Sequence, residues 1–249
     1  MDKLYAKLIL TYIETYQEAS VQELATHLNV SLETIRRDLN KMTKEDLLYR
    51  THGGAVSHKN RDIGRSFDVR RRMNSNVKKS IAENALEHFF VGAVIGLDAS
   101  SSSWNFAQLL PDLPCTVVTS SMHNIRALAN KTSIEIIATG GVYSAKYDAF
   151  YGSLSGHILS RLNIDIAICS CTGIADGIVW ESNEMNAIAK RKMLAASKKV
   201  FLLADHSKFE RKDLIQLCDL STIHHLFTNR SPPDSIQMLC RQHQINITI

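Results

Sequence analysis

The sequence predicts an α/β protein of two domains, a small helical one followed by a larger one built on a mostly parallel sheet. In the first 57 residues, apolar positions recur at three- and four-residue spacing and then give way to a short ribbon pattern. From residue 93 onward, short apolar runs alternate with helix-like segments, which is typical of a parallel sheet covered on both faces. A polar, arginine-containing stretch separates the two patterns.

The composition favours a soluble, cytoplasmic protein that does not cross a membrane. Of its 249 residues, 45% are hydrophobic and 22% are charged, as in ordinary globular domains. The longest strongly apolar run, residues 89–97, contains two glycines and is too short to span a bilayer. The first residues also lack the basic-then-apolar layout of a signal peptide.

The five cysteines are expected to be reduced thiols in the protein core. They are odd in number and lie mostly in apolar, strand-like contexts. Cys169 and Cys171 invite a metal interpretation, but one intervening residue is not the usual zinc spacing and places both thiols on one face of a strand. We therefore expect core packing here, and we predict no metal and no other cofactor.

Positive charge is concentrated in the first third of the chain. Residues 1–80 contain 15 Lys and Arg against 10 Asp and Glu, whereas the remaining 169 residues contain 14 against 15. The basic excess is therefore confined to the part of the chain that we expect to meet a polyanion.

The N-terminal domain, residues 1–57, is predicted to begin with two helices. Apolar residues recur at helical spacing from Leu4 to Tyr16 and indicate a first helix of about four turns. Ser20 and Glu23 form a capping-box pattern that opens a short second helix.

A third helix over residues 31–39 organises this domain. Ser31 is its expected N-cap, and Leu32, Ile35 and Leu39 recur at three- and four-residue spacing to form one buried stripe. A tight turn joins this helix to the second one. Two short helices joined in this way, the second one basic, are typical of a helix-turn-helix.

The face opposite the stripe carries the side chains that we expect to contact double-stranded operator DNA, although taken alone it also fits a solvated helix. Arg side chains bind phosphates and read guanine edges in the major groove. Residues 47–56 follow as a two-stranded ribbon with a glycine turn, the wing of a winged helix-turn-helix. The predicted DNA-binding residues are Ser31, Glu33, Thr34, Arg36, Arg37 and Lys41 from the helix and Arg50 and His52 from the wing. Because helix-turn-helix proteins usually bind paired half-sites, we also expect a homo-oligomer.

Residues 58–76 are predicted to be a polar linker. The segment contains five arginines but no clean apolar period, so a solvated connector is expected and DNA-phosphate contacts are the alternative. It leads into a predicted helix over residues 77–90, which begins the C-terminal domain, residues 77–249.

Alternating apolar runs define the elements of the C-terminal domain. The expected strands are 93–97, 116–119, 134–138, 164–171, 199–204 and 222–228. The clearest helices are 102–110, 123–130, 153–162, 183–197 and 233–243. In sheets of this kind, ligands bind beyond the carboxyl ends of the strands.

The first of these strand ends carries a run of serines. Hydroxyl groups and free amides at a strand-to-helix turn can bind an anion, with the helix dipole assisting. We therefore predict a phosphate or carboxylate site here, with a plain cap and loop as the alternative. The candidate residues are Asp98, Ser100, Ser101, Ser102 and Ser103.

Small or hydroxyl-bearing residues follow other strands, where a ligand can approach the backbone. These further effector-site candidates are Ser121, Gly140, Gly141, Thr172 and Gly173, and an ordinary turn is the alternative for each. Lys190 is the candidate cation for a phosphate, with a solvated helix face as the alternative. Trp180 either stacks on a sugar or fills the core.

These features combine into a resemblance to a known family. Residues 31–39, Ser-Leu-Glu-Thr-Ile-Arg-Arg-Asp-Leu, followed by Arg50-Thr51-His52-Gly53-Gly54-Ala55, resemble the DeoR family of bacterial transcriptional regulators. Residues 97–103, Gly140-Gly141 and residues 204–209 resemble landmarks of that family's sensor domain. The resemblance implies a winged helix-turn-helix joined to a sensor domain that is related to ribose-5-phosphate isomerase and binds phosphorylated sugars.

Within the family, the chain resembles the regulators that activate L-fucose operons. Residues 98–101, 170–174 and 180–183 carry this likeness, together with Trp104 and Asn186-Ala187. It implies activation of a fucose-catabolic operon and L-fuculose 1-phosphate as the effector. Two residues depart from the family pattern. Asp46 stands where many members have Gly, and Asn186 replaces a common Glu, so a ligand contact of that Glu is not carried over.

The leading hypothesis is a DNA-binding regulator, not an enzyme, whose sensor domain detects a sugar phosphate. A DeoR-type repressor of another sugar operon is one alternative. A sugar-phosphate isomerase with an N-terminal appendage is another, but it needs a carboxylate base, and Asp98, Asp176 and Glu181 lie in no recognisable catalytic motif. A non-specific nucleic-acid binder would show no preference for an operator at fixed salt.

Overall fold

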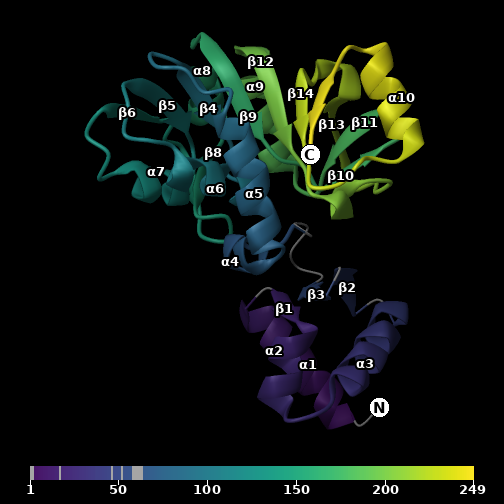
Figure 1. Cartoon of the computed structure of the whole chain (residues 1–249). Helices are drawn as coiled ribbons and strands as arrows, with labels where there is room; N and C mark the ends of the chain where they lie inside the picture. Colours follow the sequence, from purple (N-terminus) through teal and green to yellow (C-terminus); the bar gives the residue numbers. More distant parts are fainter. Residues whose placement is uncertain (1–2, 17, 46, 52, 58–63) are drawn as a thin grey trace. The chain divides into compact units, whose positions relative to one another are not determined.

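In the computed structural model, the chain forms two compact units, Met1–Arg65 and Ser66–Ile249 (Figure 1). The structure describes residues 3–16, 18–45, 47–51, 53–57 and 64–249. His52, predicted to bind DNA, and Asp46, which departs from the family pattern, lie outside the described residues.

In its described residues, the first unit has three helices and a small antiparallel sheet of order β1-β3-β2, which confirms the winged helix-turn-helix. Its core contains Ile9, Ile13, Leu24, Ile35 and Leu39, each at most 1% exposed. Strand β1 is absent from the sequence prediction because three residues carry no readable period. The elements are α1 (Lys3–Tyr16), β1 (Glu18–Ser20), α2 (Val21–Leu28), α3 (Leu32–Lys44), β2 (Leu48–Thr51) and β3 (Gly54–Ser57).

Local hydrogen bonds fix the turn between α2 and α3. The predicted capping box is confirmed, because Glu23 N donates to Ser20 Oγ at 3.0 Å and Ser20 N donates to Glu23 Oε2 at 2.8 Å. Asn29 ends α2 in the left-handed region, with a φ of 52°. Ser31 then caps α3, its Oγ accepting from Thr34 N at 3.1 Å. The turn therefore lies where the sequence predicts it.

The buried stripe of α3 differs from the prediction at one end. Ile35, Leu39 and Met42 are at most 1% exposed, whereas Leu32 is 37% exposed. Leu32 is the first residue of the helix and precedes the turn that packs on the core, while α3 continues to Lys44. The helical spacing is kept, but the stripe lies one turn further along the chain.

The wing depends on a glycine at the start of β3. A Cβ added to Gly54 would lie 2.0 Å from the carbonyl oxygen of Ala19 in β1. Gly54 is paired with Ser20 on one side and with Thr51 on the other. A residue without a side chain is therefore needed where β1 and β3 approach each other.

Seven parallel strands form the main sheet of the second unit, in the order β15-β14-β12-β9-β4-β5-β6, which confirms the predicted parallel sheet. The chain builds β4, β5 and β6 outward in one direction and then returns to the other side of β4 with β9. This reversal is a topological switch point, where ligands bind in α/β sheets. The strands are β4 (Val94–Leu97), β5 (Cys115–Thr119), β6 (Ile134–Ala138), β9 (Ile164–Cys169), β12 (Ser197–Leu203), β14 (His225–Phe227) and β15 (Asn246–Thr248).

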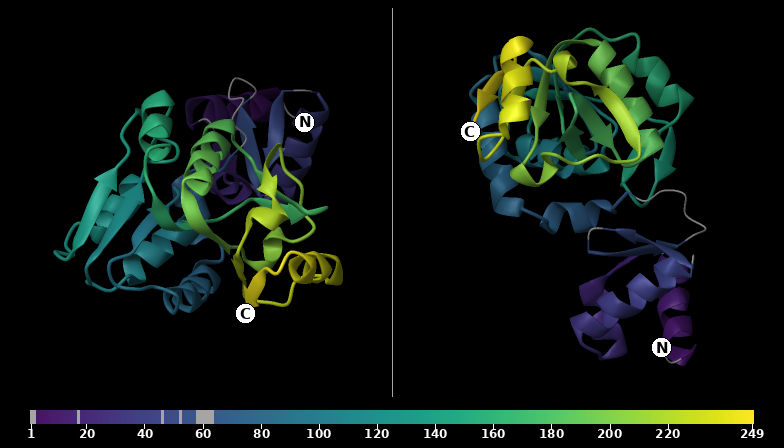
Figure 2. Two further views of the ribbon diagram at one scale, coloured as in Figure 1. Left: turned by 90° about the horizontal axis from the view of Figure 1, so that it is seen from above. Right: turned by 90° about the vertical axis from the view of Figure 1, so that its right-hand side faces the viewer.

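Helices cover both faces of this sheet (Figures 1 and 2). Alternate residues of β9 pack on opposite faces of the sheet. Ile166 and Ile168 pack with α5, α6 and α7, whereas Ala167 and Cys169 pack with α8, α9 and α10. The helices are α5 (Ser75–Leu86), α6 (Ser101–Leu109), α7 (Met122–Leu128), α8 (Ser153–Leu159), α9 (Glu184–Ala195) and α10 (Asp234–Gln242).

Two smaller antiparallel sheets and two single-turn helices add to the unit. Their strands have three to five residues, too few to give a periodic signal in the sequence. The first sheet pairs β7 (Val142–Ser144) with β8 (Ala149–Tyr151), and the second has the order β10 (Gly173–Ala175), β11 (Ile178–Glu181), β13 (Ile215–Asp219). The single-turn helices are η1 (His206–Lys208) and η2 (Leu220–Thr222).

The cysteines are free thiols, and Cys169 and Cys171 share one core cluster, as predicted. Burial raises the pKa of Cys171 to about 12, which keeps it protonated. Within the described ranges, no group of three or more His, Cys, Asp or Glu side chains is placed to hold a metal ion. In the same part of the chain, no helix combines the length and the apolar character that crossing a bilayer requires.

The second half of the predicted linker, residues 58–76, is not a simple connector. Helix α4 (Phe67–Arg72) forms there, and its Phe67 is only 2% exposed. The Phe67 ring stacks on His123 with 3.6 Å between centroids and meets Trp104 edge-on. This short helix is stabilised by the tertiary packing of one aromatic residue and not by an apolar face. Its arginine-rich sequence therefore shows no apolar period.

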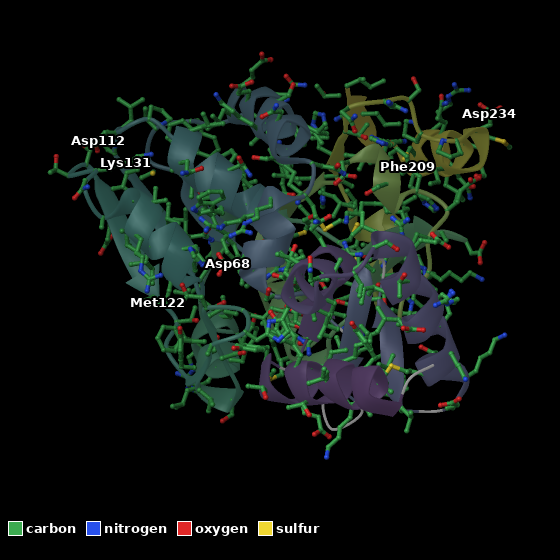
Figure 3. All side chains as sticks on the ribbon, turned by 90° about the horizontal axis from the view of Figure 1, so that it is seen from below. Asp68, Asp112, Met122, Lys131, Phe209 and Asp234 are labelled. Carbon is green, nitrogen blue, oxygen red and sulfur yellow. The ribbon has the colours of Figure 1, made fainter. Side chains whose placement is uncertain are left out.

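Lys131 binds carbonyl groups at the C-terminal end of α6, the helix that begins with the serine run. Asp112 and Lys131 lie next to each other at one edge of the unit (Figure 3). Lys131 Nζ donates to Ala107 O at 2.9 Å and to Gln108 O at 3.1 Å, and Asp112 accepts from Ser133 N at 2.8 Å. These contacts satisfy the last carbonyl groups of α6 and fix its position.

Candidate functional site

Helix α3 presents two arginines to solvent. The side chains of Arg36 and Arg37 are 57% and 75% exposed. Their carboxylate neighbours are distant, since Glu33 Oε2 lies 3.9 Å from Arg36 and Asp38 Oδ1 lies 3.8 Å from Arg37. Ion pairs of this length with a largely exposed arginine contribute little, so both guanidinium groups can bind a phosphate or a base edge.

Other predicted DNA contacts differ in accessibility. Ser31 and Lys41 are exposed, and Thr34 is half-buried. Arg50 is tied to its own wing, because its NH1 donates to Gly54 O at 2.7 Å. Partial burial lowers the pKa of Arg50, and the nearby charge of Arg36 lowers it further. The positive charges of Arg36 on the helix and Arg50 on the wing therefore lie close together.

Asp98 lies at the carboxyl end of β4, on one side of the switch point. Its Oδ1 accepts from Ser100 N at 3.0 Å and from Ser103 Oγ at 2.5 Å, and its Oδ2 accepts from Ser170 N, beyond the end of β9, at 3.2 Å. Burial by itself would raise the pKa of this carboxyl. Lys190 and the three hydrogen bonds outweigh burial and hold the pKa of Asp98 below its ordinary value.

Lys190 of α9 joins Asp98 to a second buried carboxylate, Glu181. Its Nζ lies 3.1 Å from Asp98 Oδ2 and 2.5 Å from Glu181 Oε2, and it donates to Ser170 O at 2.6 Å. Burial lowers the pKa of Lys190, but the two carboxylates raise it above its ordinary value. An ammonium group has three donors, and these three contacts use them. Lys190 is therefore engaged by carboxylates, which opposes its predicted role as the cation for a phosphate.

Ser100 and Ser103 hold the turn after β4. Ser100 is the N-cap of α6, and its Oγ accepts from Ser103 N at 3.1 Å. Ser103 is fully buried, and its hydroxyl binds Asp98 and lies 3.1 Å from Ile168 O. The hydroxyl groups of both serines thus make hydrogen bonds within the fold. This agrees with the alternative interpretation, in which the serine run is a plain cap and loop.

Ser101 and Ser102 occupy the first turn of α6 beside a buried cation. Lys78 of α5 is 6% exposed, and its Nζ donates to Ser101 Oγ at 3.0 Å and to Arg70 O at 2.7 Å. The sequence prediction omits Lys78. The available signal is a lysine on the apolar face of its helix, one turn before Ile81.

A narrow cleft opens beside Asp98 and Lys190. The space between its lining atoms is about 340 Å³, which includes solvent at its mouth. This volume is at the low end of the range for small-molecule sites. Of the predicted effector residues, Asp98 and Lys190 line this cleft. The lining residues are Leu97, Asp98, Ala99, Val118, Thr119, Ser120, Tyr151, Leu159, Asn186, Ala189, Lys190 and Met193.

Tyr151 and Asn186 face each other in the lining of this cleft. The Tyr151 hydroxyl donates to Asn186 Oδ1 at 2.5 Å, and the two residues are 3% and 9% exposed. Burial raises the pKa of Tyr151, so the hydroxyl stays protonated. Tyr151 has no signal in the sequence because it ends a three-residue strand, and Asn186 is visible there only as a departure from the family pattern.

Ser121, Gly140 and Gly141 have local structural roles outside the cleft lining. Ser121 is the fully buried N-cap of α7 and accepts from Asn124 N at 3.3 Å. Gly140 and Gly141 have φ values of 61° and 116°, and a Cβ on Gly141 would lie 2.3 Å from Tyr151 O. Glycine is therefore required where this turn touches the strand that carries Tyr151.

Gly173 and Trp180 lie in the sheet formed by β10, β11 and β13, and Thr172 directly precedes β10. Thr172 N and Thr172 Oγ1 donate to Trp180 O at 2.9 Å and 3.1 Å, and Gly173 is the strand partner of Trp180. The Trp180 indole donates to Ala175 O at 3.3 Å. These contacts support the fold, and a role of the three residues in effector binding stays a prediction.

A helix-turn-helix with exposed arginines, joined to a second unit with a cleft at its switch point, defines a DNA-binding regulator with a ligand-sensing domain. Comparison with known families agrees. Residues 6–61 match the DeoR-like helix-turn-helix domain, and residues 73–230 match the DeoR C terminal sensor domain. The chain therefore belongs to the DeoR family, whose members are transcriptional regulators and not enzymes.

Over nearly its full length, the chain is similar to regulators of operons and regulons. The L-fucose operon activator of Haemophilus influenzae is 56% identical over 240 residues, 96% of each chain. The L-fucose operon activator of Escherichia coli is 34% identical over 89% of this chain and 92% of its own. The Glycerol-3-phosphate regulon repressor of Escherichia coli is 27% identical over 97% of this chain and 96% of its own.

Among solved structures, the chain is similar to ribose 5-phosphate isomerase A from Methanocaldococcus jannaschii. The similarity covers 55% of each chain, with 16% sequence identity and a TM-score of 0.41.

Proposed function

We propose that this DeoR-family regulator activates an L-fucose operon in the cytoplasm, in response to a phosphorylated sugar such as L-fuculose 1-phosphate. The 56% identity to the Haemophilus influenzae L-fucose operon activator, over 96% of each chain, carries the proposal. The second candidate is repression of another operon. The similarity to a repressor, the Glycerol-3-phosphate regulon repressor, favours it at 27% identity.

In this proposal, the phosphate of the effector binds at the first turn of α6. Ser101 and Ser102 supply hydroxyl and amide groups at a helix N-terminus. Lys78, whose Nζ lies 3.0 Å from Ser101 Oγ, supplies the positive charge. Lys190 is less suited to this role because two carboxylates, Asp98 and Glu181, already surround it.

Effector binding at this turn also affects α4. The carbonyl oxygen of Arg70 accepts from both Lys78 Nζ and Ser101 Oγ, and Arg70 NH1 donates to Ala99 O at 3.2 Å. A phosphate that accepts hydrogen bonds from Lys78 and Ser101 competes with the Arg70 carbonyl for these donors. The contacts of α4 therefore differ between the effector-free and the effector-bound protein. Because α4 follows the DNA-binding unit in the chain, the effector shifts the population of a homo-oligomer with paired DNA-binding units.

A thermal-shift screen of the full chain tests the effector class. A ligand that binds only the folded state raises the apparent Tm with the logarithm of its concentration. We expect L-fuculose 1-phosphate to raise the Tm and free L-fucose to leave it unchanged. A shift with glycerol 3-phosphate alone favours the second candidate, and no shift with any sugar phosphate contradicts a sugar-phosphate sensor.

Ser101→Asp is expected to abolish the effector response while the variant still binds operator DNA. The new carboxylate would lie beside Lys78, neutralise that cation and repel a phosphate. Fluorescence anisotropy of labelled operator, titrated with and without L-fuculose 1-phosphate, measures the response. The matched control is Ser153→Asp, an exposed serine at the start of α8. A normal response in the Ser101→Asp variant removes the first turn of α6 from the proposed site.

A further inference from the structure

We infer that Tyr151 and Asn186 are specificity-determining residues, which read the hydroxyl groups of the effector's carbohydrate part while its phosphate lies outside their cleft. This inference rests on the proposed function, because it concerns the same effector. Neither residue is among the effector-site candidates predicted from the sequence. In this inference, the cleft recognises the carbohydrate and the first turn of α6 recognises the phosphate.

The charge of the cleft favours the uncharged part of the ligand. Asp98 and Glu181 surround Lys190, so the buried group has two negative charges and one positive charge. The three donors of Lys190 are bound to Asp98, Glu181 and the Ser170 carbonyl. Arg70 brings a second positive charge near the lining, where its NH1 donates to Ala99 O. A phosphate pushed into this cleft would still meet two carboxylates and a lysine whose donors are occupied. Sugar hydroxyl groups, in contrast, can donate to carboxylates.

The Tyr151–Asn186 pair adds neutral groups to the same lining, with Asn186 one turn before Lys190 on α9. Since the Tyr151 hydroxyl donates to Asn186 Oδ1, the phenol oxygen can still accept a hydrogen bond. Within the described residues, Asn186 Nδ2 makes no hydrogen bond, so the amide can donate to a hydroxyl group. An acceptor and a donor held side by side recognise a hydroxyl group and its stereochemistry.

The rest of the lining indicates the class of sugar. Apolar side chains form much of the cleft, namely Leu97, Val118, Leu159 and Met193, together with two alanines. A fully hydroxylated sugar would bury hydroxyl groups against this surface without partners, whereas a methyl group packs there favourably. The combination of an apolar wall with a small set of polar groups fits a deoxy sugar.

The backbone fixes the position of Tyr151. The turn at Gly140-Gly141 touches the end of β8 so closely that a Cβ on Gly141 would lie 2.3 Å from Tyr151 O. Tyr147 packs edge-on against Tyr151, with 6.1 Å between ring centroids. The phenol is thus held on a short strand by backbone and ring contacts, which is what selective recognition requires.

Two variants of the full chain test this inference by isothermal titration calorimetry. Tyr151→Phe removes the hydroxyl, and Asn186→Asp keeps an acceptor for Tyr151 while it removes the amide donor and adds negative charge. The ligands are L-fuculose 1-phosphate, its C4 epimer L-rhamnulose 1-phosphate, and inorganic phosphate. The control is Tyr143→Phe, which alters a tyrosine on the neighbouring strand that is 51% exposed.

We expect each variant to bind the preferred sugar phosphate about 10-fold more weakly, the effect of one lost buried hydrogen bond. The ratio of affinities for the two epimers is expected to fall toward one, while inorganic phosphate binds each variant as it binds the wild type. Circular dichroism verifies that each variant is folded, and the isosteric Asn186→Asp remains decisive where Tyr151→Phe is unstable.

The outcomes separate the inference from the proposed function. If the wild type binds no sugar phosphate, the proposed function fails and the inference fails with it. If the wild type binds and both variants keep its affinity and epimer ratio, the inference alone is overturned. Equal weakening for both epimers and inorganic phosphate also overturns it, because the pair would then act on the whole site and not on the carbohydrate.

Discussion

The Lys190→Met variant is expected to unfold with a free energy about 3–5 kcal/mol lower than that of the wild type. Lys190 contacts Asp98 and Glu181, which are 5% and 3% exposed. Methionine keeps the length of the side chain but removes its charge, so two buried carboxylates lose their cation. Urea denaturation followed by circular dichroism measures the difference.

The pH dependence of this effect gives a second signature. In the wild type, the pKa of Asp98 lies below its unfolded value, so Asp98 stabilises the fold above that unfolded value and loses this contribution as the pH falls through the folded pKa. Without Lys190, burial dominates and raises the pKa. The variant is therefore expected to recover part of its stability between about pH 7 and about pH 5.

The matched control is Lys192→Met, on the exposed side of the same helix. Its expected change is within about 0.5 kcal/mol. An equal loss of stability in the two variants, or a loss in Lys190→Met that does not vary with pH, would mean that the ion cluster does not stabilise the sensor unit as described.

Replacing both Arg36 and Arg37 with alanine is expected to weaken operator binding by about 100-fold or more. Each guanidinium that binds a base edge contributes about 1–3 kcal/mol, and a phosphate contact adds a salt-dependent part. Both side chains are largely exposed, and among the described residues their ion partners lie 3.8–3.9 Å away. Fluorescence anisotropy with a labelled operator and with random duplex, at the same salt concentration, measures the loss and its sequence specificity.

Lys7→Ala is the control for loss of positive charge on the same unit, since Lys7 is exposed on α1. It is expected to change operator affinity little. The affinity of the Arg36 and Arg37 double variant for L-fuculose 1-phosphate is expected to equal that of the wild type. Loss of effector affinity together with operator affinity would show that the two functions are not separate.

Much of the fold could be predicted from the sequence because local signals specify it. The capping box at Ser20 and Glu23 opens α2, and the spacing of Ile35 and Leu39 defines α3. The parallel strands are continuous apolar runs because both faces of the sheet are buried. The serine run follows β4 at the strand-to-helix turn, where Ser100 and Ser103 have structural roles, and the anion site expected there stays a prediction.

The parts that the sequence could not give depend on contacts between distant segments. Phe67 holds α4 by packing on His123, a residue 56 positions further along the chain, and no local pattern encodes that contact. Lys190 is visible as a candidate cation, but its two carboxylate partners converge only when α9, β4 and β11 are assembled. Tyr151 ends a strand of three residues, which is too short to show a period.

We propose that one unit binds operator DNA and that the other unit controls this binding through a bound sugar phosphate. The most direct test is the operator affinity of the full chain at fixed salt, with and without saturating L-fuculose 1-phosphate. We predict a change of about 10-fold with the sugar phosphate and none with inorganic phosphate, a typical coupling between two sites. An operator affinity that stays the same while calorimetry shows the sugar phosphate bound would contradict that claim.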